Sequence, residues 1–342
     1  MSMSDLRAAI QAEMQAAFPV AEARVLPFYG MQEYHLGWRD SDLRPTSADP
    51  GKLLRPLLAL LAAQAVGGTL THAMPLAAGI QLIHDFSLIH DDIEDNSDLR
   101  RGRVTLWTRW GLAQGLNAGD GMFVLAHLAL HRMSAAGVPA ERVLTVLQRF
   151  DETILTICEG QYLDISFEGN LAISEADYLA MIGRKTAALI AASASLGALA
   201  CGAEAATVEA FAAFGRGLGL AFQIEDDILG IWGEPEVTGK PRAADLYRRK
   251  VSLPVIRALR SPHGAAMATI YQQGAPTDDD VRRALELLAA AEARAYCVAE
   301  ARQHHLAALA ALDRVRPGAT PEAHAALGQI RAIAESLLGR QA

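Results

Sequence analysis

The sequence predicts an all-α fold, and three observations support this prediction. Nearly every segment of the 342 residues repeats its apolar positions at the helical period, and no run alternates β-branched with polar residues. Alanine and leucine, which favour helices, supply much of the 51% hydrophobic fraction, whereas aromatic residues make up 6%. The breaks between periodic segments are rich in Gly, Pro and Asp. We therefore expect one all-α domain over residues 1–342.

The expected helices follow from these breaks in chain order. The breaks are "RPTSADPG" (44–51), "VGG" (66–68), "GEPEVTGKP" (233–241), "RSPHG" (260–264) and "RVRPGATP" (314–321). The helices are expected near 4–18, 52–66, 75–95, 117–135, 140–167, 175–203, 205–232, 253–261, 278–312 and 321–339. Pro75, a favoured first-turn residue, should begin the third helix, which is apolar on nearly all sides and therefore buried. In the helix over 205–232, Phe214 and Leu218 lie at helical spacing.

Charge and cysteine content limit the class of partner. The formal net charge is −8 and no long basic run occurs, which argues against nucleic acid as a partner. The three cysteines lie far apart and in no metal-ligand spacing, as expected of a cytoplasmic protein. The N-terminus has no signal-peptide pattern. The uncharged stretch 186–203 is rich in Ala, Ser and Gly, so we expect a buried helix and no transmembrane segment.

The first acidic region, "IHDDIEDNSDLRRG" (89–102), ends the helix predicted over 75–95. Asp91, Asp92 and Asp95 crowd one helical turn, and the macrodipole disfavours anions at a helix C-terminus. A bound Mg²⁺ would offset both effects, because it takes oxygen ligands and pairs carboxylates with phosphate oxygens. The alternative is a solvated acidic helix end. The adjoining Arg100 and Arg101 favour the metal site, since they can meet the phosphate.

The second acidic region, "AFQIEDDILGIWG" (221–233), repeats the pattern with Asp226 and Asp227. Alone, it would more often be a solvated helix end than a metal site. Together with the first region and dispersed cations, it suits a bundle that holds diphosphates through metals at one mouth. The cations are Lys52, Arg55, Arg100, Arg101, Lys185, Lys240 and Lys250. Because a buried apolar helix lies behind the first region, the expected substrate has an anionic head and an apolar tail.

Six segments in order resemble the trans-isoprenyl diphosphate synthases, also called polyprenyl synthetases, and most of all their medium-chain geranylgeranyl and farnesyl diphosphate synthases. They are "GKLLRP" (51–56), "HDFSLIHDDIEDNSDLRRG" (84–102), "GQYLD" (160–164), "MIGRKTAAL" (181–189), "FQIEDDILG" (222–230) and "GKPRAADLYRRKVSLP" (239–254). The resemblance implies an isoprenoid-synthase-type helical bundle around a deep central cavity, usually a homodimer. It also implies Mg²⁺-dependent condensation of isopentenyl diphosphate with an allylic diphosphate, with about three metal ions and release of pyrophosphate.

The resemblance assigns roles residue by residue. Asp91, Asp92 and Asp95 would hold Mg²⁺ with the allylic diphosphate, and Asp226 and Asp227 would hold a further Mg²⁺. Arg100, Lys185 and Lys240 would contact the allylic diphosphate, and Lys52, Arg55 and Arg101 the isopentenyl diphosphate. Gln161, Thr186, Gln223 and Lys250 would lie near the developing carbocation or its leaving group. His84 is interpreted as a hydrogen-bonded core residue, with a place in the substrate site as the alternative.

Two positions depart from the family pattern. Gly230 stands where the second motif ordinarily closes with a third aspartate. Because Mg²⁺ keeps several waters and borrows phosphate oxygens, we still expect the second region to work, and Gly230→Asp to change Mg²⁺ dependence only modestly. Val104 stands where the family tends to have proline, which leaves the site assignment unchanged.

The bulk that lines the pocket floor sets product length in this family. Phe86 lies five residues before Asp91, about 7.5 Å along the helix axis, and Ser87 shares the face of the aspartates. In having an aromatic side chain at this position, the sequence resembles synthases that make a C20 product. A C15 product is the second candidate. The alternative is that Phe86 only packs in the core.

Other functions remain compatible with the sequence. A class I terpene cyclase would use the same fold and the first aspartates but would not need an isopentenyl diphosphate site, and Gly230 keeps this alternative open. A non-catalytic subunit of a heteromeric prenyl synthase is a second alternative. A purely structural bundle would leave the joint acidic and basic segments unexplained.

Overall fold

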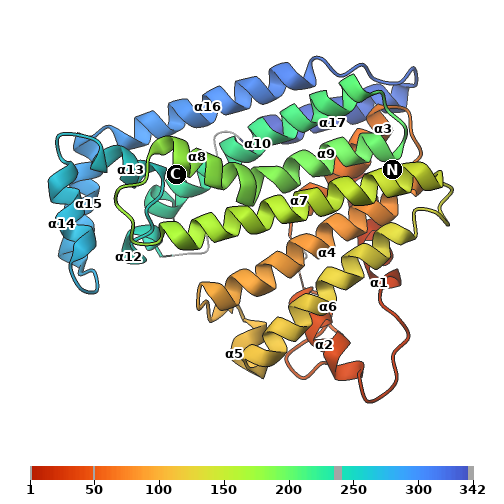
Figure 1. Ribbon diagram of the computed structural model, residues 1–342, viewed down its shortest axis with the longest axis horizontal. Helices are drawn as coiled ribbons and strands as arrows, with labels where there is room; N and C mark the ends of the chain where they lie inside the picture. The colour runs from red at the N-terminus through yellow and green to blue at the C-terminus, as the bar shows by residue number, and fades with distance from the viewer. Residues whose placement is uncertain (1, 49–50, 235–240, 338–342) are drawn as a thin grey trace. The chain divides into compact units, whose positions relative to one another are not determined.

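The computed structural model describes residues 2–48, 51–234 and 241–337, and its regular structure is almost entirely helical (Figure 1). The all-α prediction is therefore confirmed. The chain divides into two compact units. The first comprises Met1–Asp151, Ser193–Val208 and Pro317–Leu327, and the second comprises Glu152–Ala192, Glu209–Arg316 and Gly328–Ala342.

The first unit holds the N-terminal helices and a short hairpin. Its helices are α1 (Met3–Ala16), α2 (Leu26–His35), α3 (Leu54–Ala65), α4 (Leu70–Glu94), α5 (Leu106–Trp110) and α6 (Leu112–His131). The strands β1 (Leu99–Arg100) and β2 (Arg103–Val104) pair antiparallel. Four helices contribute residues to both units, namely α7 (Ala140–Phe167), α9 (Ala188–Ala200), α10 (Ala205–Trp232) and α17 (Pro321–Leu337).

The core of the first unit surrounds α4, the helix that carries the first acidic region. Helices α1, α3 and α6 all pack against it. Leu58 and Leu60 of α3 are fully buried, as is Ile80 of α4. A Cβ at Gly79 would collide with Leu130 of α6, so the glycine permits the two helices to approach closely. The acidic end of α4 is thus positioned by a helix packed on several sides.

The second unit contains the remaining helices. They are α8 (Glu175–Ile182), the π-helical turn η1 (Gly183–Ala187), α12 (Ala244–Tyr247), α13 (Leu253–Leu259), α14 (Gly264–Gln272), α15 (Asp278–Ala290) and α16 (Ala293–Leu312). Helix α13 packs against α8, α14, α15 and α16. Ile224 and Ile228 of α10 join Leu253 and Ile256 of α13 in one buried apolar cluster, which fixes the acidic end of α10.

The observed helices match the expected ranges closely in some places and less so in others. The ranges 140–167 and 205–232 agree with α7 and α10. Pro75 does not begin its helix, since α4 starts at Leu70 and contains the proline. The helix expected over 278–312 is broken where Glu292 takes a left-handed backbone, φ 51°. Helices α2, α5, α12 and α14 were not predicted. Of these, α5 and α12, with five and four residues, are too short for a helical period to stand out.

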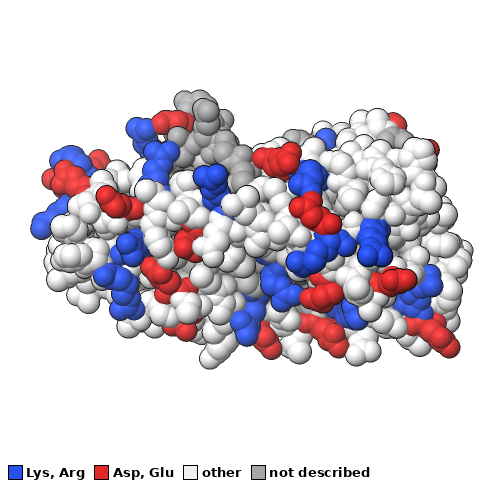
Figure 2. Space-filling view, turned by 90° about the horizontal axis from the view of Figure 1, so that it is seen from above, with Lys and Arg blue, Asp and Glu red and all other residues white. Residues whose placement is uncertain are grey.

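One helical stretch in the described ranges is long and apolar enough to cross a membrane. It is Glu175–Ala200, with a mean hydropathy of 1.2 over its most apolar window, of which 56% is buried in the structure. A buried core helix of a soluble protein can meet the same criteria of length and hydropathy. On the face shown in Figure 2, basic and acidic side chains are interspersed among uncharged surface.

Candidate active site

The first acidic region lies at the C-terminal end of α4. Asp91 is partly buried, Asp92 is buried, and Asp95, which caps the helix, is exposed. Asn96 then adopts a left-handed backbone, φ 50°, as asparagine does more readily than most residues. Ile89, one residue before His90, is buried in the core. The three carboxylates therefore stand at the end of a well-packed helix, as the sequence predicted.

The β1–β2 hairpin brings Arg100 to this helix end. Its turn residues Arg101 and Gly102 both have positive φ, 52° and 73°. The Nε of Arg100 donates a hydrogen bond to Oδ1 of Asp92 over 2.8 Å. Burial raises the pKa of Asp92, although the charge and hydrogen bond of Arg100 oppose the shift. Arg100 is thus already held beside the aspartates by one of them.

A pocket of about 620 Å³ opens beside this ion pair, a volume in the range of small-molecule sites. Its cationic lining side chains are Arg7, Lys52, Arg100, Arg101 and Arg103, and among its described lining residues Asp92 is the one carboxylate. His35 and Thr105 also line it. Such an excess of positive charge in a chain of net charge −8 suits a multiply charged anion such as a diphosphate.

Arg55 and His84 lie together in the same unit. The Nη1 of Arg55 is 3.3 Å from Nε2 of His84. Burial, followed by the charge of Arg55, holds the pKa of His84 well below its ordinary value of 6.5. The imidazole is therefore neutral near pH 7 and can accept a hydrogen bond from the guanidinium. His84 thus orients an arginine that the sequence assigned to substrate.

A buried carboxylate lies next to His84 in the sequence. Asp85 accepts a hydrogen bond from Nε2 of Gln81 at 2.8 Å, and its Oδ1 lies 3.6 Å from Nε2 of His35. Burial raises the pKa of Asp85, but the hydrogen bond and charge of His35 outweigh it, so the net shift is downward. Asp85 therefore anchors His35, which forms part of the pocket wall.

The two candidate floor residues have different surroundings. The ring of Phe86 stands 4.7 Å from that of His90 and 5.4 Å from that of Phe123 on α6, measured between centroids. The Oγ of Ser87 donates to the backbone oxygen of His84 over 2.8 Å. Phe86 is thus backed by an aromatic group from another helix, which limits how far its ring can be displaced.

The second acidic region lies near the end of α10. Asp227 is fully buried, whereas Asp226 is partly buried. The Oδ2 of Asp227 accepts a hydrogen bond from the Tyr178 hydroxyl, and Oδ1 accepts one from Nε2 of Gln223 at 3.3 Å. Burial raises the pKa of Asp227, although Lys250 and Tyr178 oppose the shift. Both oxygens of Asp227 are therefore engaged within the second unit.

Residues predicted near the carbocation are brought together in this unit. The Oγ1 of Thr186 donates to Oε1 of Gln223 over 2.8 Å. Because Gln223 in turn donates to Asp227, the three side chains form one hydrogen-bonded row. The row fixes the orientation of the Gln223 amide, which is otherwise free to flip.

The π-helical turn η1 positions Lys185. Its Nζ donates to Oδ2 of Asp164 on α7 over 2.5 Å. A Cβ at Gly160 would collide with the backbone of Lys185, so the glycine allows α7 to approach the turn. Single π-helical turns are frequent at functional sites. Gln161, which follows Gly160, is partly buried beside this approach.

The space beside Gly230 is filled by another carboxylate. A Cβ at position 230 would collide with Oδ2 of Asp245, a buried residue on α12. An aspartate at this position would force two carboxylates together, which costs free energy through both overlap and like charge. Gly230→Asp is therefore expected to lower the stability of the protein, and its expected modest effect on Mg²⁺ dependence stays a prediction.

Two lysines downstream of the second acidic region, Lys240 and Lys250, were predicted to belong to the site. The Nζ of Lys250 lies 3.6 Å from Oδ1 of Asp227. Burial lowers the pKa of Lys250, but the charges of Asp227, Asp245 and further carboxylates outweigh it and raise the pKa overall. Lys240 lies outside the described residues, so its predicted role stays a prediction.

Sequence reasoning missed three residues that hold the predicted ones in place. Asp164 pairs with Lys185, Tyr178 donates to Asp227, and Asp245 fills the space beside Gly230. Asp164 and Asp245 stand inside the segments "GQYLD" and "GKPRAADLYRRKVSLP", so their motif positions were an available signal. Tyr178 carries no comparable pattern.

The donor chemistry fits magnesium bound together with substrate. In the described ranges, no three His, Cys, Asp or Glu side chains gather closely enough to hold a metal ion unaided. Hard carboxylate oxygens are supplied by the candidate ligands Asp91, Asp92, Asp95, Asp226 and Asp227. Mg²⁺ typically binds through one or two carboxylates plus phosphate oxygens and water, so a closed protein cage is not required.

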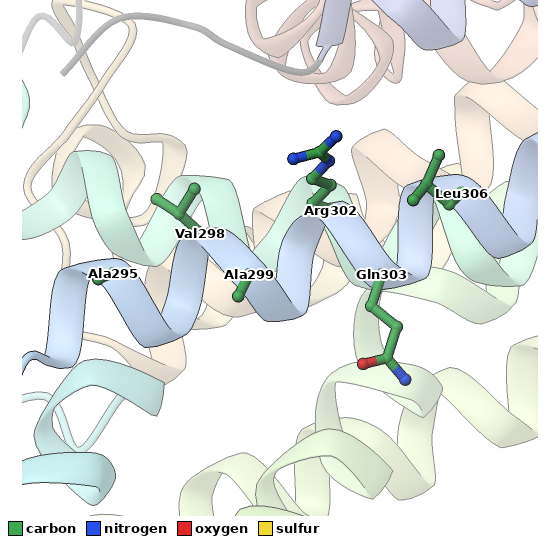
Figure 3. Close-up of a pocket in the computed structure, with 6 residues that line it drawn as sticks. All are labelled: Ala295, Val298, Ala299, Arg302, Gln303 and Leu306. Carbon is green, nitrogen blue, oxygen red and sulfur yellow. The ribbon is translucent and has the colours of Figure 1, made fainter.

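A second surface hollow lies along α16 alone. Its labelled lining residues, Ala295, Val298, Ala299, Arg302, Gln303 and Leu306, all come from that helix (Figure 3). Val298 and Leu306 are 46% and 54% exposed. One helix face cannot exclude water from a reactive intermediate, so the candidate active site stays with the acidic regions.

The sequence of this chain is similar to those of known proteins over most of its length. A sequence model of the family Polyprenyl synthetase matches residues 42–288. A (2E,6E)-farnesyl diphosphate synthase of Mycobacterium tuberculosis is 39% identical over 317 residues, which cover 90% of this chain and 85% of that protein. A geranylgeranyl diphosphate synthase of the same organism is 41% identical over 295 residues, covering 85% and 83%.

Solved structures show the same likeness. The crystal structure of a polyprenyl synthetase from Streptomyces coelicolor matches with a TM-score of 0.88 at 32% identity and covers 98% of both chains. A geranylgeranyl pyrophosphate synthetase from Pyrococcus horikoshii matches with a TM-score of 0.85 at 28% identity, covering 99% and 97%. This chain, which carries both acidic regions and the cationic pocket, belongs to the polyprenyl synthetase family.

Proposed function

We propose that this chain is a prenyltransferase that joins isopentenyl diphosphate head to tail to an allylic diphosphate and releases pyrophosphate. The observation that carries the proposal is the cationic pocket beside Asp92, which holds Lys52, Arg100 and Arg101. A reaction of two diphosphates needs more cations than one of a single diphosphate. Family membership and relatives named as farnesyl and geranylgeranyl diphosphate synthases support the same assignment.

The two acidic regions take part in one reaction in this proposal. Asp91, Asp92 and Asp95 would hold Mg²⁺ with the allylic diphosphate, and Asp226 and Asp227 would hold a further Mg²⁺. When bound, the metal supplies charge stabilisation for the departing pyrophosphate. About three ions take part, as is usual for the family.

The cationic side chains bind and orient the two diphosphates. Arg100, Lys185 and Lys240 bind the allylic diphosphate, whose negative charge grows as the C–O bond breaks. Lys52, Arg55 and Arg101 bind isopentenyl diphosphate, and the neutral His84 keeps the Arg55 guanidinium oriented. The hydrogen bond of Lys185 to Asp164 supports this role, because it fixes the ammonium group before substrate arrives.

The polar row of the second unit stabilises the allylic cation. The Gln223 amide and Thr186 hydroxyl present fixed dipoles, and Gln161 and Lys250 lie in the same unit. A dry pocket prevents water from capturing the cation before the alkene attacks. The departing pyrophosphate takes the final proton, so no side chain is needed as a dedicated base.

We propose that the main product is the C20 compound geranylgeranyl diphosphate, and the C15 compound farnesyl diphosphate is the second candidate. Phe86 forms the pocket floor, backed by Phe123, and Ser87 lies beside it on the same helix. Phe86→Ala is expected to lengthen the main product by at least one isoprene unit, because the ring no longer blocks the growing chain. Product sizing after dephosphorylation checks this, and an unchanged product would remove Phe86 from the floor.

The enzyme acts as a soluble, cytoplasmic homodimer with one catalytic domain per chain. Support for the dimer comes from α6, on which Leu112, Leu116, Val124 and Leu128 are 53%, 43%, 52% and 47% exposed. Their spacings of four and eight residues favour one side of the helix. A second copy can cover such a surface, as apolar interface cores require.

The direct test uses purified protein, Mg²⁺, labelled isopentenyl diphosphate and, separately, dimethylallyl, geranyl and farnesyl diphosphate. Linear labelled products that grow by isoprene units are expected, and chelation of Mg²⁺ should abolish them. Hydrocarbon formed from farnesyl diphosphate alone, with no label incorporated, would identify a terpene cyclase. No turnover by the purified chain, with activity restored by a second synthase subunit, would identify a non-catalytic subunit.

A further inference from the structure

We propose that Arg7, on the N-terminal helix α1, binds the diphosphate of isopentenyl diphosphate together with Lys52 and Arg101. The inference rests on the proposed function and adds a binding residue to it. Arg7 lines the same pocket as Lys52, Arg101 and the Asp92–Arg100 pair. It precedes residues 42–288, the part of the chain that the family model matches, so no family motif includes it.

Helix α1 is fixed well enough to aim this side chain. Ser2 and Asp5 cap its N-terminus reciprocally, each side chain accepting a hydrogen bond from the other's backbone nitrogen. Leu6 and Ile10 are 2% and 0% exposed, because α1 packs against α3 and α4. Arg7 follows the buried Leu6 and is exposed at the pocket. The helix cannot roll without exposing its apolar face.

Two other arginines of the pocket, Arg100 and Arg103, have partners that hold them. Arg100 donates to Asp92. Arg103 lies over the Tyr34 ring at 4.1 Å and donates to the backbone oxygens of Tyr34 and Arg39 over 2.8 Å and 2.7 Å. Arg7, by contrast, makes no hydrogen bond or ion pair with the described residues. Its guanidinium therefore keeps its donors available for an anion.

The charge balance of the pocket favours a ligand with several negative charges. Arg7 adds to the charges of Lys52 and Arg101, whereas Asp92, the one carboxylate among the described lining residues, already pairs with Arg100. Like charges around one pocket repel one another until an anion compensates them. A diphosphate offers enough oxygens for a planar guanidinium to bind two at once. The proposed function assigns Lys52 and Arg101 to isopentenyl diphosphate, and Arg100, which it assigns to the allylic diphosphate, is paired with Asp92. The ligand that fits Arg7 is therefore isopentenyl diphosphate.

The experiment compares Arg7→Ala and Arg7→Lys with Arg24→Ala, which removes the same charge from an exposed residue outside the pocket. Steady-state kinetics with Mg²⁺ give KM for each substrate, and calorimetry gives the affinity for isopentenyl diphosphate alone. Arg7→Ala should raise KM for isopentenyl diphosphate and weaken its binding about 5- to 20-fold, with KM for the allylic diphosphate unchanged. Arg7→Lys should fall between wild type and Arg7→Ala, because lysine cannot bind two oxygens with fixed geometry.

Three outcomes overturn the inference. They are an unchanged KM for isopentenyl diphosphate in a folded Arg7→Ala variant, an equal rise of KM for both substrates, and an equal effect of Arg24→Ala. Thermal unfolding of each variant verifies the fold. Failure of the proposed function can be told apart from failure of this inference. If wild-type protein binds isopentenyl diphosphate in calorimetry but never incorporates it into product, the proposed reaction is rejected. The binding affinities of the variants can still be compared in that case.

Discussion

The two acidic regions resemble each other in sequence and differ in structure. At the end of α4, Asp91 is partly buried and Asp95 is exposed, and the one buried member, Asp92, pairs with an arginine. At the end of α10, Asp227 is fully buried and engaged on both oxygens, and Gly230 replaces a third acid. The same residue pattern thus leaves two of three carboxylates at least partly exposed in the first region, whereas in the second region it buries Asp227 and holds both of its oxygens in hydrogen bonds. The first region is suited to bind metal directly, and the second to orient a polar row with fewer ligands.

The largest effect is expected in the first region. Asp91→Ala removes a carboxylate that the proposal places on Mg²⁺, so kcat should fall about 10³-fold. Because Asp91 is only partly buried, the thermal stability should change little. Steady-state incorporation of labelled isopentenyl diphosphate measures the loss. A kcat within tenfold of wild type would show that the first region is not the main metal site.

The next effect concerns the space beside Gly230. Gly230→Asp should destabilise the protein by about 2–4 kcal/mol, because the new carboxylate meets that of Asp245. Denaturant unfolding measures this loss. The double variant Gly230→Asp/Asp245→Gly should recover most of the stability, since one carboxylate then occupies the space. Equal stability of Gly230→Asp and wild type would mean that Asp245 does not compete for this space.

A smaller loss of stability, which depends on pH, is expected when Asp85 of α4 is replaced. Because the folded pKa of Asp85 lies below its ordinary value of 3.8, Asp85 stabilises the fold at pH values above 3.8. That contribution is lost as the pH falls through the folded pKa. Asp85→Asn should therefore destabilise the protein by about 1–3 kcal/mol near pH 7 and by progressively less below 3.8. Urea unfolding over this pH range tests it, and a difference independent of pH would contradict the pairing with His35.

The smallest effect isolates the hydrogen bond to Asp227. Tyr178→Phe removes the hydroxyl that donates to this fully buried carboxylate and should cost about 1–2 kcal/mol of stability. Tyr271→Phe is a matched control, because that hydroxyl donates to a backbone oxygen, that of Lys250, instead of to a carboxylate. Chemical denaturation of both variants makes the comparison. An equal loss in the two would show that the charge of Asp227 adds nothing to the bond.

Much of the fold could be predicted because long helices repeat their apolar pattern many times. This is why α7 and α10 were located closely, whereas α12, with four residues, left no period to detect. The candidate ligands at 91, 92 and 95 were predictable because carboxylates at a helix C-terminus oppose local stability and need a compensating cation. Pro75 misled the prediction because a first-turn preference does not exclude an interior position in a packed helix.

The support around the site could not be predicted in the same way. The bond of Tyr178 to Asp227 joins residues 49 positions apart, and that of Lys185 to Asp164 joins residues 21 apart. The motif position of Asp164 could mark it as a candidate, but which residues pair depends on how helices pack, and no local pattern encodes the pairing. The presence of Arg7 in the pocket likewise depends on the packing of α1 against α3 and α4. The sequence therefore indicated the chemistry, and the tertiary structure selected the residues that orient it.

The central claim is that the second acidic region is a working partner of the first despite Gly230. Asp226→Ala measures this most directly, through kcat for incorporation of labelled isopentenyl diphosphate over a titration of Mg²⁺. We predict that kcat falls at least about 10²-fold at saturating Mg²⁺ while thermal stability stays near that of wild type. A folded Asp226→Ala variant with wild-type kcat and wild-type Mg²⁺ dependence would contradict the claim and leave the second region with a structural role only.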